Sequence, residues 1–273
     1  MKILIAGYGY LGAALAKSLV LRGNEVCGLS RKPSADIPSV QLIAADLMKP
    51  ETLIELPKVD HVVLCQAPSK SDNYYDTYVV GTRNQIQALA GKLSGKLIFI
   101  SSTRVYGRAQ GESGAWIDEF VEPKPDDEDG RSLLEAERIV SEASGIVFRL
   151  GGIYGPGRNR IRQIRSGELV PEFSETYVNR IHVEDVVQGI ELLLIKGRPG
   201  EVYLGVDDRP TTQNEFYTWL FERLSLQISP PGAKASARSH GPSNKRCSND
   251  KLKKLGFQLK YPTYQEGYSS LIS

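Results

Sequence analysis

The feature that most constrains this chain is a glycine-rich turn that follows an apolar run near its start. Residues 2–6 read KILIA, and residues 7–12 read GYGYLG. An amphipathic stretch then runs from residue 11 to residue 22. A short apolar run that ends at glycine is typical of a buried strand, whereas the spacing of apolar residues after it is typical of a helix. The pattern therefore predicts a strand, a tight turn and a helix in immediate succession.

Short apolar runs alternate with helical patterns over residues 1–150. The expected strands cover residues 2–6, 25–29, 41–44, 61–64, 96–100 and 146–150. The expected helices cover residues 11–22, 52–56, 73–92 and 131–142. This alternation indicates a parallel sheet with helices on both faces, whose strands are continuously apolar because both faces are covered. We expect an α/β fold, namely a Rossmann-type doubly wound parallel sheet of at least six strands.

The pattern loosens after residue 150. Residues 151–180 are rich in glycine and arginine, and a helix at 183–195, a strand at 201–205 and a helix at 212–224 are expected to follow. Thr211 or Thr212 is a candidate cap of the last helix. Residues 227–247 have no periodicity and are expected to form a loop. We expect a core of residues 1–150, joined by 181–206, and a smaller substrate-side lobe of residues 151–180 and 207–273.

The glycine turn has the form GxGxxG, and each glycine has its own physical reason. Gly7 permits the tight turn, Gly9 lets a pyrophosphate approach the backbone, and Gly12 lets helix and strand pack closely. The N-terminus of the next helix offers free N–H groups and a positive dipole end to phosphates. With a strand before it and a helix after it, the turn predicts dinucleotide binding, with a turn that binds no ligand as the alternative. The expected contacts are Gly7, Tyr8, Gly9, Tyr10, Leu11 and Gly12.

The end of the second expected strand bears on which dinucleotide binds. An acidic residue at this place would bind the ribose 2′-hydroxyl of NAD. Here Ser30, Arg31 and Lys32 follow the strand instead. A serine can donate to a phosphate, and an arginine offers it a planar fork. The segment therefore favours NADP over NAD, although a solvated basic loop is an alternative.

Composition excludes several other classes of protein. Lys and Arg total 34 against 32 Asp and Glu, so bulk charge points to no nucleic-acid or acidic membrane partner. The three cysteines are far apart in sequence and form no CxxC pair, which favours a reducing, cytoplasmic compartment. With only three histidines besides, a metal site is not expected. No apolar run is long enough to span a membrane, and a soluble protein is expected.

Several segments together resemble the extended short-chain dehydrogenase/reductase family, the NAD(P)-dependent epimerases and dehydratases that act mainly on nucleotide sugars. Residues 79–84 are similar to the family's vNvxGTxN helix, and residues 101–107 are similar to its SSxxVYG segment. Residues 149–156 and 180–186 match its RxxxxYGP and RxxHVxDV segments. The resemblance implies adenine contacts from Asp46 and Leu47. It also places a small-residue loop under the cofactor at Gln66, Ala67 and Pro68.

The family's catalytic Tyr-x-x-x-Lys is missing, since none of the 13 tyrosines has Lys four residues later. Aligned on Gly130, Ser132 and Glu137, the Tyr position holds Asp129 and the Lys position holds Leu133. In the family this Tyr is the acid/base, and the Lys lowers its pKa and holds the nicotinamide ribose. Leucine can do neither, and an exposed Asp is a poor proton donor at neutral pH.

Three residues remain catalytic candidates. Ser102 matches the family's catalytic Ser/Thr, and Tyr106 is a candidate replacement acid. Asp129 is a candidate base, although it could equally cap the helix after it. Arg158, Arg160, Arg162 and Arg165 could clamp an anionic group of a substrate or lie in a solvated basic loop.

The resemblance leaves two functions open. One is an atypical NADP-dependent reductase, epimerase or dehydratase that acts on a small sugar-like, nucleotide-sugar or other anionic substrate. The other is a non-catalytic NADP-binding sensor or regulator that kept the pocket without the chemistry. A homodimer is also left open, because residues 73–92 and 131–142 match the helices through which family members pair.

Overall fold

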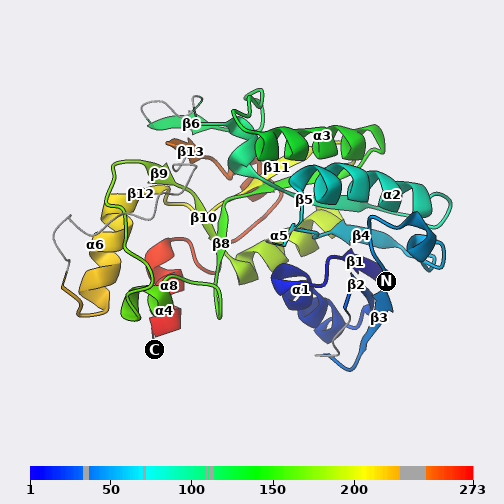
Figure 1. Cartoon of the computed structure of the whole chain (residues 1–273), viewed down its shortest axis with the longest axis horizontal. Coiled ribbons are helices and arrows are strands. Elements are labelled where there is room, and N and C mark those ends of the chain that lie inside the picture. The colour runs from blue at the N-terminus through cyan, green and yellow to red at the C-terminus, as the bar shows by residue number, and fades with distance from the viewer. Residues whose placement is uncertain (33–36, 70–71, 109, 111–113, 228–243, 273) are drawn as a thin grey trace.

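Seven parallel strands form the central sheet of the computed structural model, which describes residues 1–32, 37–69, 72–108, 110, 114–227 and 244–272 (Figure 1). Every neighbouring pair in the sheet is parallel, so the predicted Rossmann-type sheet is confirmed. The strands lie in the order β11 (Val202–Gly205), β7 (Ile146–Leu150), β5 (Leu97–Ser102), β4 (His61–Leu64), β1 (Lys2–Ala6), β2 (Glu25–Ser30) and β3 (Val40–Ala44).

The direction in which strands are added reverses at β1. From β1 the chain adds β2 and β3 on one side, then crosses to the other side and adds β4, β5 and β7. In open α/β sheets, ligands bind outside the carboxyl ends of the strands at such a reversal. The topology therefore directs attention to the segments that leave β1 and β4.

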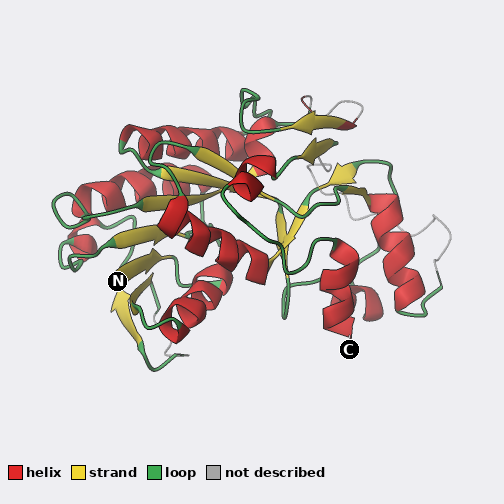
Figure 2. Cartoon of the chain, turned by 180° about the vertical axis from the view of Figure 1, so that it is seen from behind, coloured by secondary structure: helices red, strands yellow, loops and turns green. Residues whose placement is uncertain are grey.

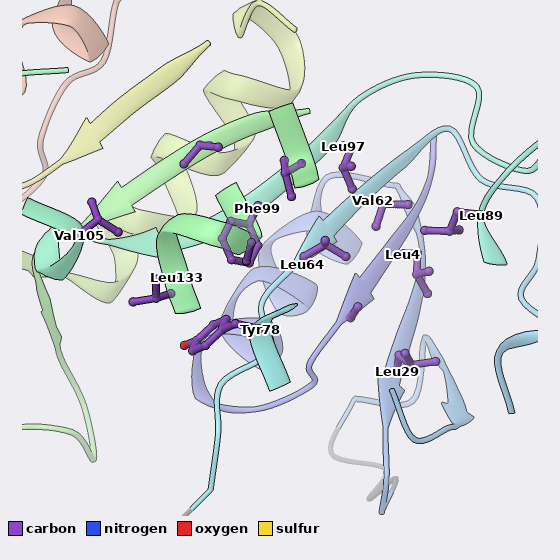
Figure 3. Packing of buried hydrophobic residues seen from close by; sticks show 14 of the residues in the cluster. Leu4, Leu29, Val62, Leu64, Tyr78, Leu89, Leu97, Phe99, Val105 and Leu133 are labelled. Carbon is purple, nitrogen blue, oxygen red and sulfur yellow. The ribbon is translucent and has the colours of Figure 1, made fainter. Parts of the chain in front are cut away.

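Helices cover both faces of the sheet. On one face, α1 (Tyr10–Leu21) and α5 (Val183–Lys196) pack Leu15 and Ile190 into a core that also holds Ile3 of β1. On the other face, α2 (Gly81–Ala88) and α3 (Glu128–Glu142) enclose a second core (Figure 3). Burial on both faces explains why the strand sequences are almost wholly apolar.

Two helical segments differ from what the sequence pattern predicts. The helix expected at 73–92 begins with a π-helical segment, η2 (Asp76–Val80), and α2 ends at Ala88. The helix expected at 52–56 is a short 3-10 helix, η1 (Pro50–Leu53). A further 3-10 helix, η3 (Thr103–Tyr106), follows β5 directly. Single π turns within helices are frequent at functional sites, and η2 lies beside the cavity described below.

Three small sheets lie outside the central one. β8 (Gly152–Tyr154) pairs in parallel with β10 (Arg180–His182), and β9 (Tyr177–Val178) pairs antiparallel with β12 (Thr211–Thr212). β6 (Ala115–Ile117) pairs in parallel with β13 (Lys245–Cys247). Residues 245–247 were expected within a loop, so that expectation was wrong for this part; residues 228–243 lie outside the described residues.

A third hydrophobic cluster packs three further helices together, and these helices lie apart from the central sheet in Figure 2. It joins α4 (Ile161–Arg165), α6 (Gln213–Arg223) and α8 (Tyr264–Ile272). The Thr212 hydroxyl caps α6 in a capping box with Glu215, which resolves the choice between the two threonines. By contrast, Leu252 of α7 (Asp250–Lys254) packs in the core beneath the central sheet. No helix in the described part of the chain is long and apolar enough to cross a membrane.

Candidate functional site

A cavity of about 870 Å³ opens at the carboxyl ends of the central strands. This volume lies in the range of small-molecule and cofactor pockets. The segments that follow β1, β2, β3, β4, β5 and β7 all contribute to its wall. Twelve of the expected cofactor contacts line it, namely Gly7, Tyr8, Gly9, Tyr10, Leu11, Ser30, Arg31, Asp46, Leu47, Gln66, Ala67 and Pro68.

The three glycines of the turn occupy different environments. Gly7 has φ +98°, and a Cβ there would lie 2.6 Å from the carbonyl carbon of Cys65. A Cβ on Gly12 would lie 2.2 Å from the Gly7 carbonyl oxygen, so Gly12 serves packing although it does not line the cavity. A Cβ on Gly9 would meet no protein atom within 4 Å. The open side of Gly9 is the side from which a pyrophosphate could approach the backbone.

The helix that starts after the turn leaves its first amides for a ligand. α1 begins at Tyr10 with Gly9 as its N-cap, and no side chain caps it. Tyr10 and Leu11 of the first turn both line the cavity. Uncapped N–H groups and the positive end of the helix dipole make such a place suited to phosphate. The turn and the helix together therefore fit the pyrophosphate of a dinucleotide.

The loop after β4 offers a buried acceptor. The Gln66 Nε2 donates a hydrogen bond of 2.9 Å to the Thr82 hydroxyl, which fixes the orientation of the amide. The Gln66 Oε1 is buried and has no hydrogen-bond partner among the described residues. Buried acceptors are nearly always paired in folded proteins, so an unpaired one on a residue that lines a cavity suits a ligand hydroxyl. This observation also fits a dinucleotide in the cavity.

Of the residues expected to contact the adenosine end of the cofactor, some line the cavity and one does not. Ser30 and Arg31 line the cavity, whereas Lys32 is exposed and does not. Arg31 forms a two-point ion pair with Asp72, with nitrogen–oxygen distances of 3.1 and 2.9 Å. Asp46 lines the cavity as well, and its Oδ1 accepts a hydrogen bond from the Met48 amide.

Ser102 ends β5 at the wall of the cavity. Its hydroxyl accepts a hydrogen bond of 3.2 Å from the Arg104 amide and caps η3. The proton of the Ser102 hydroxyl is therefore free to be donated to a ligand oxygen. Ser101, one residue earlier, also lines the cavity, but its hydroxyl donates to the buried carboxylate of Glu137.

The placement of Tyr106 argues against the role of replacement acid. The side chain is fully buried and does not line the cavity. Its hydroxyl donates to the Asp118 carbonyl and accepts from Arg149, each over 2.8 Å. Burial raises the pKa of Tyr106 further from neutrality. The tyrosine of the VYG segment is thus part of a buried network, because η3 turns it into the core.

Asp129 and Leu133 lie one turn apart on α3, and the cavity touches only the second. Leu133 lines the cavity and is almost wholly buried. Asp129 is outside the lining, and its carboxylate lies 3.0 Å from the Arg104 guanidinium. The same guanidinium pairs with Asp127 over 2.8 Å, and Asp127, not Asp129, caps the helix. The expected base is thus held in a charge cluster at the edge of the site.

Two tyrosines that the sequence analysis did not single out also line the cavity. Tyr74 and Tyr78 are one helical turn apart, with ring centroids separated by 5.4 Å. Tyr78 packs edge-on against Phe99 and belongs to the same buried cluster as Leu133 (Figure 3). Burial raises the pKa of Tyr78, so its hydroxyl stays protonated at neutral pH. The signal was the i, i+4 spacing of two tyrosines on an expected helix.

Only one arginine of the expected clamp reaches the cavity. Arg158 lines it, and its guanidinium lies 5.5 Å from the centre of the Tyr10 ring. Arg160 donates instead to the side chain of Gln163. Arg162 and Arg165 lie on the short helix α4 and are absent from the cavity wall. Three arginines line the cavity, namely Arg31, Arg104 and Arg158. Arg31 and Arg104 are paired with carboxylates, so Arg158 is the one that has no ion pair among the described residues.

Comparisons with known proteins agree with this geometry. Residues 3–204 match the model of the NAD dependent epimerase/dehydratase family. Protein YeeZ of Escherichia coli is 30% identical over an alignment of 276 positions, which covers 96% of each chain. A second Escherichia coli relative, N-acetyl-alpha-D-glucosaminyl-diphospho-ditrans,octacis-undecaprenol 4-epimerase, is 27% identical over 83% of this chain and 73% of its own.

The solved structures lead to the same group. A protein of Methylobacillus flagellatus, assigned to the NAD-dependent epimerases/dehydratases, is 36% identical and superposes with a TM-score of 0.83. The superposition covers 99% of this chain and 97% of that one. The family model spans most of the central sheet and both strands from which the glycine turn and Ser102 extend. This chain therefore belongs to the NAD-dependent epimerase/dehydratase family.

Proposed function

We propose that this protein is an NADP-dependent oxidoreductase of the epimerase/dehydratase type that acts on a sugar-like or nucleotide-sugar substrate. The observation that carries the proposal is that the glycine turn and Ser102 line one and the same cavity. A ligand held by its phosphates at the turn would extend along the carboxyl ends of the strands toward Ser102. When bound, the nicotinamide cofactor supplies hydride transfer.

Different residues of the cavity would bind different parts of the dinucleotide. The amides at the start of α1 and the open side of Gly9 would hold the pyrophosphate. The orphaned Gln66 Oε1 would accept a hydrogen bond from a ribose hydroxyl. Ser30 and Arg31 would contact the 2′-phosphate that distinguishes NADP.

Ser102 and Tyr78 are the groups proposed to handle the proton. The Ser102 hydroxyl can donate to a substrate oxygen and orient it, since it accepts a hydrogen bond from the Arg104 amide and its own proton is not used in that bond. The Tyr78 side chain lines the cavity and is proposed to donate its proton to an oxygen that gains charge during reduction. Burial raises its pKa, so it would release the proton only to a strongly basic oxygen. Asp129, paired with Arg104 outside the cavity wall, is not assigned a part in this step.

Arg158 is proposed to meet the anionic part of the substrate. It is a cation on the cavity wall, close to the ring of Tyr10. Guanidinium groups bind phosphate with two parallel hydrogen bonds. A diphospho-linked sugar fits this site chemically, and the 4-epimerase among the relatives carries such a group in the name of its substrate.

A non-catalytic NADP-binding sensor is the second candidate. It is favoured by Leu133, which puts an apolar side chain on the cavity wall at the place of the family's lysine. Such a protein would bind the dinucleotide and release it unchanged. Fold cannot separate the two candidates, because function depends on the site.

Two measurements separate them. Thermal unfolding with NADP or NAD present tests binding, because a ligand of the folded state raises the midpoint. Oxidation of NADPH is then followed with a panel of nucleotide sugars that carry a keto group. We expect a higher midpoint with NADP and turnover with at least one nucleotide sugar. Binding without turnover across the panel supports the sensor, and an unchanged midpoint with both dinucleotides contradicts both candidates.

A further inference from the structure

Arg31 and Asp72 form an ion pair at the adenosine end of the cavity, and both residues line it. The two guanidinium nitrogens of Arg31 each donate to a different oxygen of the Asp72 carboxylate, over 3.1 and 2.9 Å. Arg31 directly follows β2, whereas Asp72 lies between β4 and η2. The pair therefore joins the two segments that flank the place proposed for the adenosine ribose.

Asp72 is held in position independently of Arg31. Its Oδ2 accepts hydrogen bonds from the amide of Ser69, over 3.0 Å, and from the hydroxyl of Ser69, over 2.8 Å. The bond from Arg31 is the main cause that keeps the pKa of Asp72 well below its usual range. A carboxylate is thus fixed beside the arginine that would bind a 2′-phosphate.

This arrangement has opposite consequences for the two dinucleotides. A 2′-phosphate needs the same planar fork of Arg31 that Asp72 already occupies, and it is repelled by the carboxylate. A free 2′-hydroxyl can instead donate a hydrogen bond to a carboxylate, as it does to the acid that ends the second strand in NAD-binding proteins. Here that strand ends in Ser30. Asp72 brings a carboxylate to the same region from the loop after β4, on the other side of β1.

We propose that Asp72 is a specificity-determining residue that lowers the preference for NADP over NAD by pairing with Arg31. This inference rests on the proposed function, since it requires a dinucleotide with its adenosine ribose beside Ser30 and Arg31. It concerns the ratio of the two affinities and holds whichever dinucleotide the unmodified protein prefers.

The test is calorimetric titration of the full chain with NADP and with NAD, before and after the substitution Asp72→Asn. Asparagine keeps the size of the side chain and an oxygen that can accept from Ser69, but it loses the charge. We expect the affinity for NADP relative to NAD to rise about tenfold, because one negative charge beside the phosphate is removed. Asp76→Asn is the matched control, since Asp76 lines the cavity without an ion pair in the described structure. It should leave the ratio within about twofold.

A double substitution tests whether the effect passes through Arg31. In Arg31→Ala, the further change Asp72→Asn should raise the ratio clearly less than it does in the unmodified protein. Without Arg31 the change relieves only the direct repulsion between carboxylate and phosphate and releases no guanidinium for the phosphate. An equal rise with and without Arg31, or an unchanged ratio in Asp72→Asn, overturns the inference while dinucleotide binding stands. A raised ratio in a protein whose unmodified form prefers NAD supports the inference and contradicts the proposed NADP preference. Binding of neither dinucleotide contradicts both proposals.

Discussion

The Arg149 guanidinium donates a 2.8 Å hydrogen bond to the Tyr106 hydroxyl, and this contact lies in the core and not in the cavity. The same guanidinium pairs with Glu137, whose carboxylate also accepts from Ser101. The motif residues after β5 and on α3 are therefore linked by one buried polar network. Such a network is stabilising only when all of its members are satisfied.

The substitution Tyr106→Phe should lower stability and leave dinucleotide affinity unchanged. It removes the donor to the Asp118 carbonyl and an acceptor for Arg149, and unsatisfied buried groups cost about 1–3 kcal/mol. Urea unfolding gives the free energy, and calorimetry gives the affinity for NADP. If the variant kept its full stability and lost activity, Tyr106 would have a catalytic role, which would contradict this interpretation.

Ser102→Ala and Tyr78→Phe should each reduce turnover while the dinucleotide still binds. Loss of a positioned proton donor typically reduces rates by about 10²–10⁴-fold. The measurements are kcat on the substrate identified in the panel and the Kd for NADP. Tyr75→Phe is the matched control, because Tyr75 is exposed and outside the cavity wall. Equal losses in Tyr75→Phe and Tyr78→Phe would remove the reason for assigning the proton to Tyr78.

Gly9→Ala should lower the affinity for NADP, whereas Gly12→Ala should lower the stability of the fold. The Gly9 backbone is extended, with φ −98°, and the added methyl would meet no protein atom, so the fold should persist. That methyl would occupy the space proposed for the pyrophosphate, and NADP affinity should fall by about tenfold or more. The methyl of Gly12→Ala would collide with the Gly7 carbonyl oxygen, so the thermal midpoint should fall first. Normal NADP affinity in Gly9→Ala would contradict the proposal that the pyrophosphate binds at the glycine turn.

The sequence predicts the central sheet well because its signals are local. Apolar runs such as residues 61–64 and 146–150 are buried on both faces, and their boundaries coincide with β4 and β7. The glycine turn is local too, since the strand, turn and helix are contiguous in the chain. The cap of α6 is a local signal as well: the sequence narrowed it to Thr211 or Thr212, and Thr212 is the cap.

What the sequence does not predict depends on partners far away in the chain. β13 has no apolar alternation, and Lys245–Cys247 is a strand because it pairs with β6 and bonds to the side chain of Asn179. The pairing of Arg31 with Asp72 spans 41 residues and joins the segments after β2 and β4, which have β1 between them in the sheet. The burial of Tyr106 depends on the 3-10 helix η3, which the spacing of apolar residues in the sequence does not predict. Pairings of this kind come from tertiary packing and override local preference.

Lys245 gives the protein a component of stability that depends on pH. The side chain is almost fully buried, its Nζ donates to the Gly107 carbonyl over 3.1 Å, and burial lowers its pKa to about 8. Below pH 8 the ammonium is buried at a cost, whereas the unfolded chain keeps its proton up to about pH 10.4. Between these two values the unfolded state binds more protons, so this contribution to stability rises with pH.

The substitution Lys245→Met should remove this component. Urea unfolding of both proteins at about pH 7 and about pH 10 gives the difference in unfolding free energy between them, in which the titration of other groups largely cancels. From the lower to the higher pH, this difference should shift in favour of the unmodified protein by up to about 3 kcal/mol. Lys254→Met is the control, because Lys254 is exposed and has no ion pair in the described part of the chain, so it measures the loss of a lysine that is not buried. A difference that stays constant with pH would show that burial does not destabilise the ammonium beside the Gly107 carbonyl.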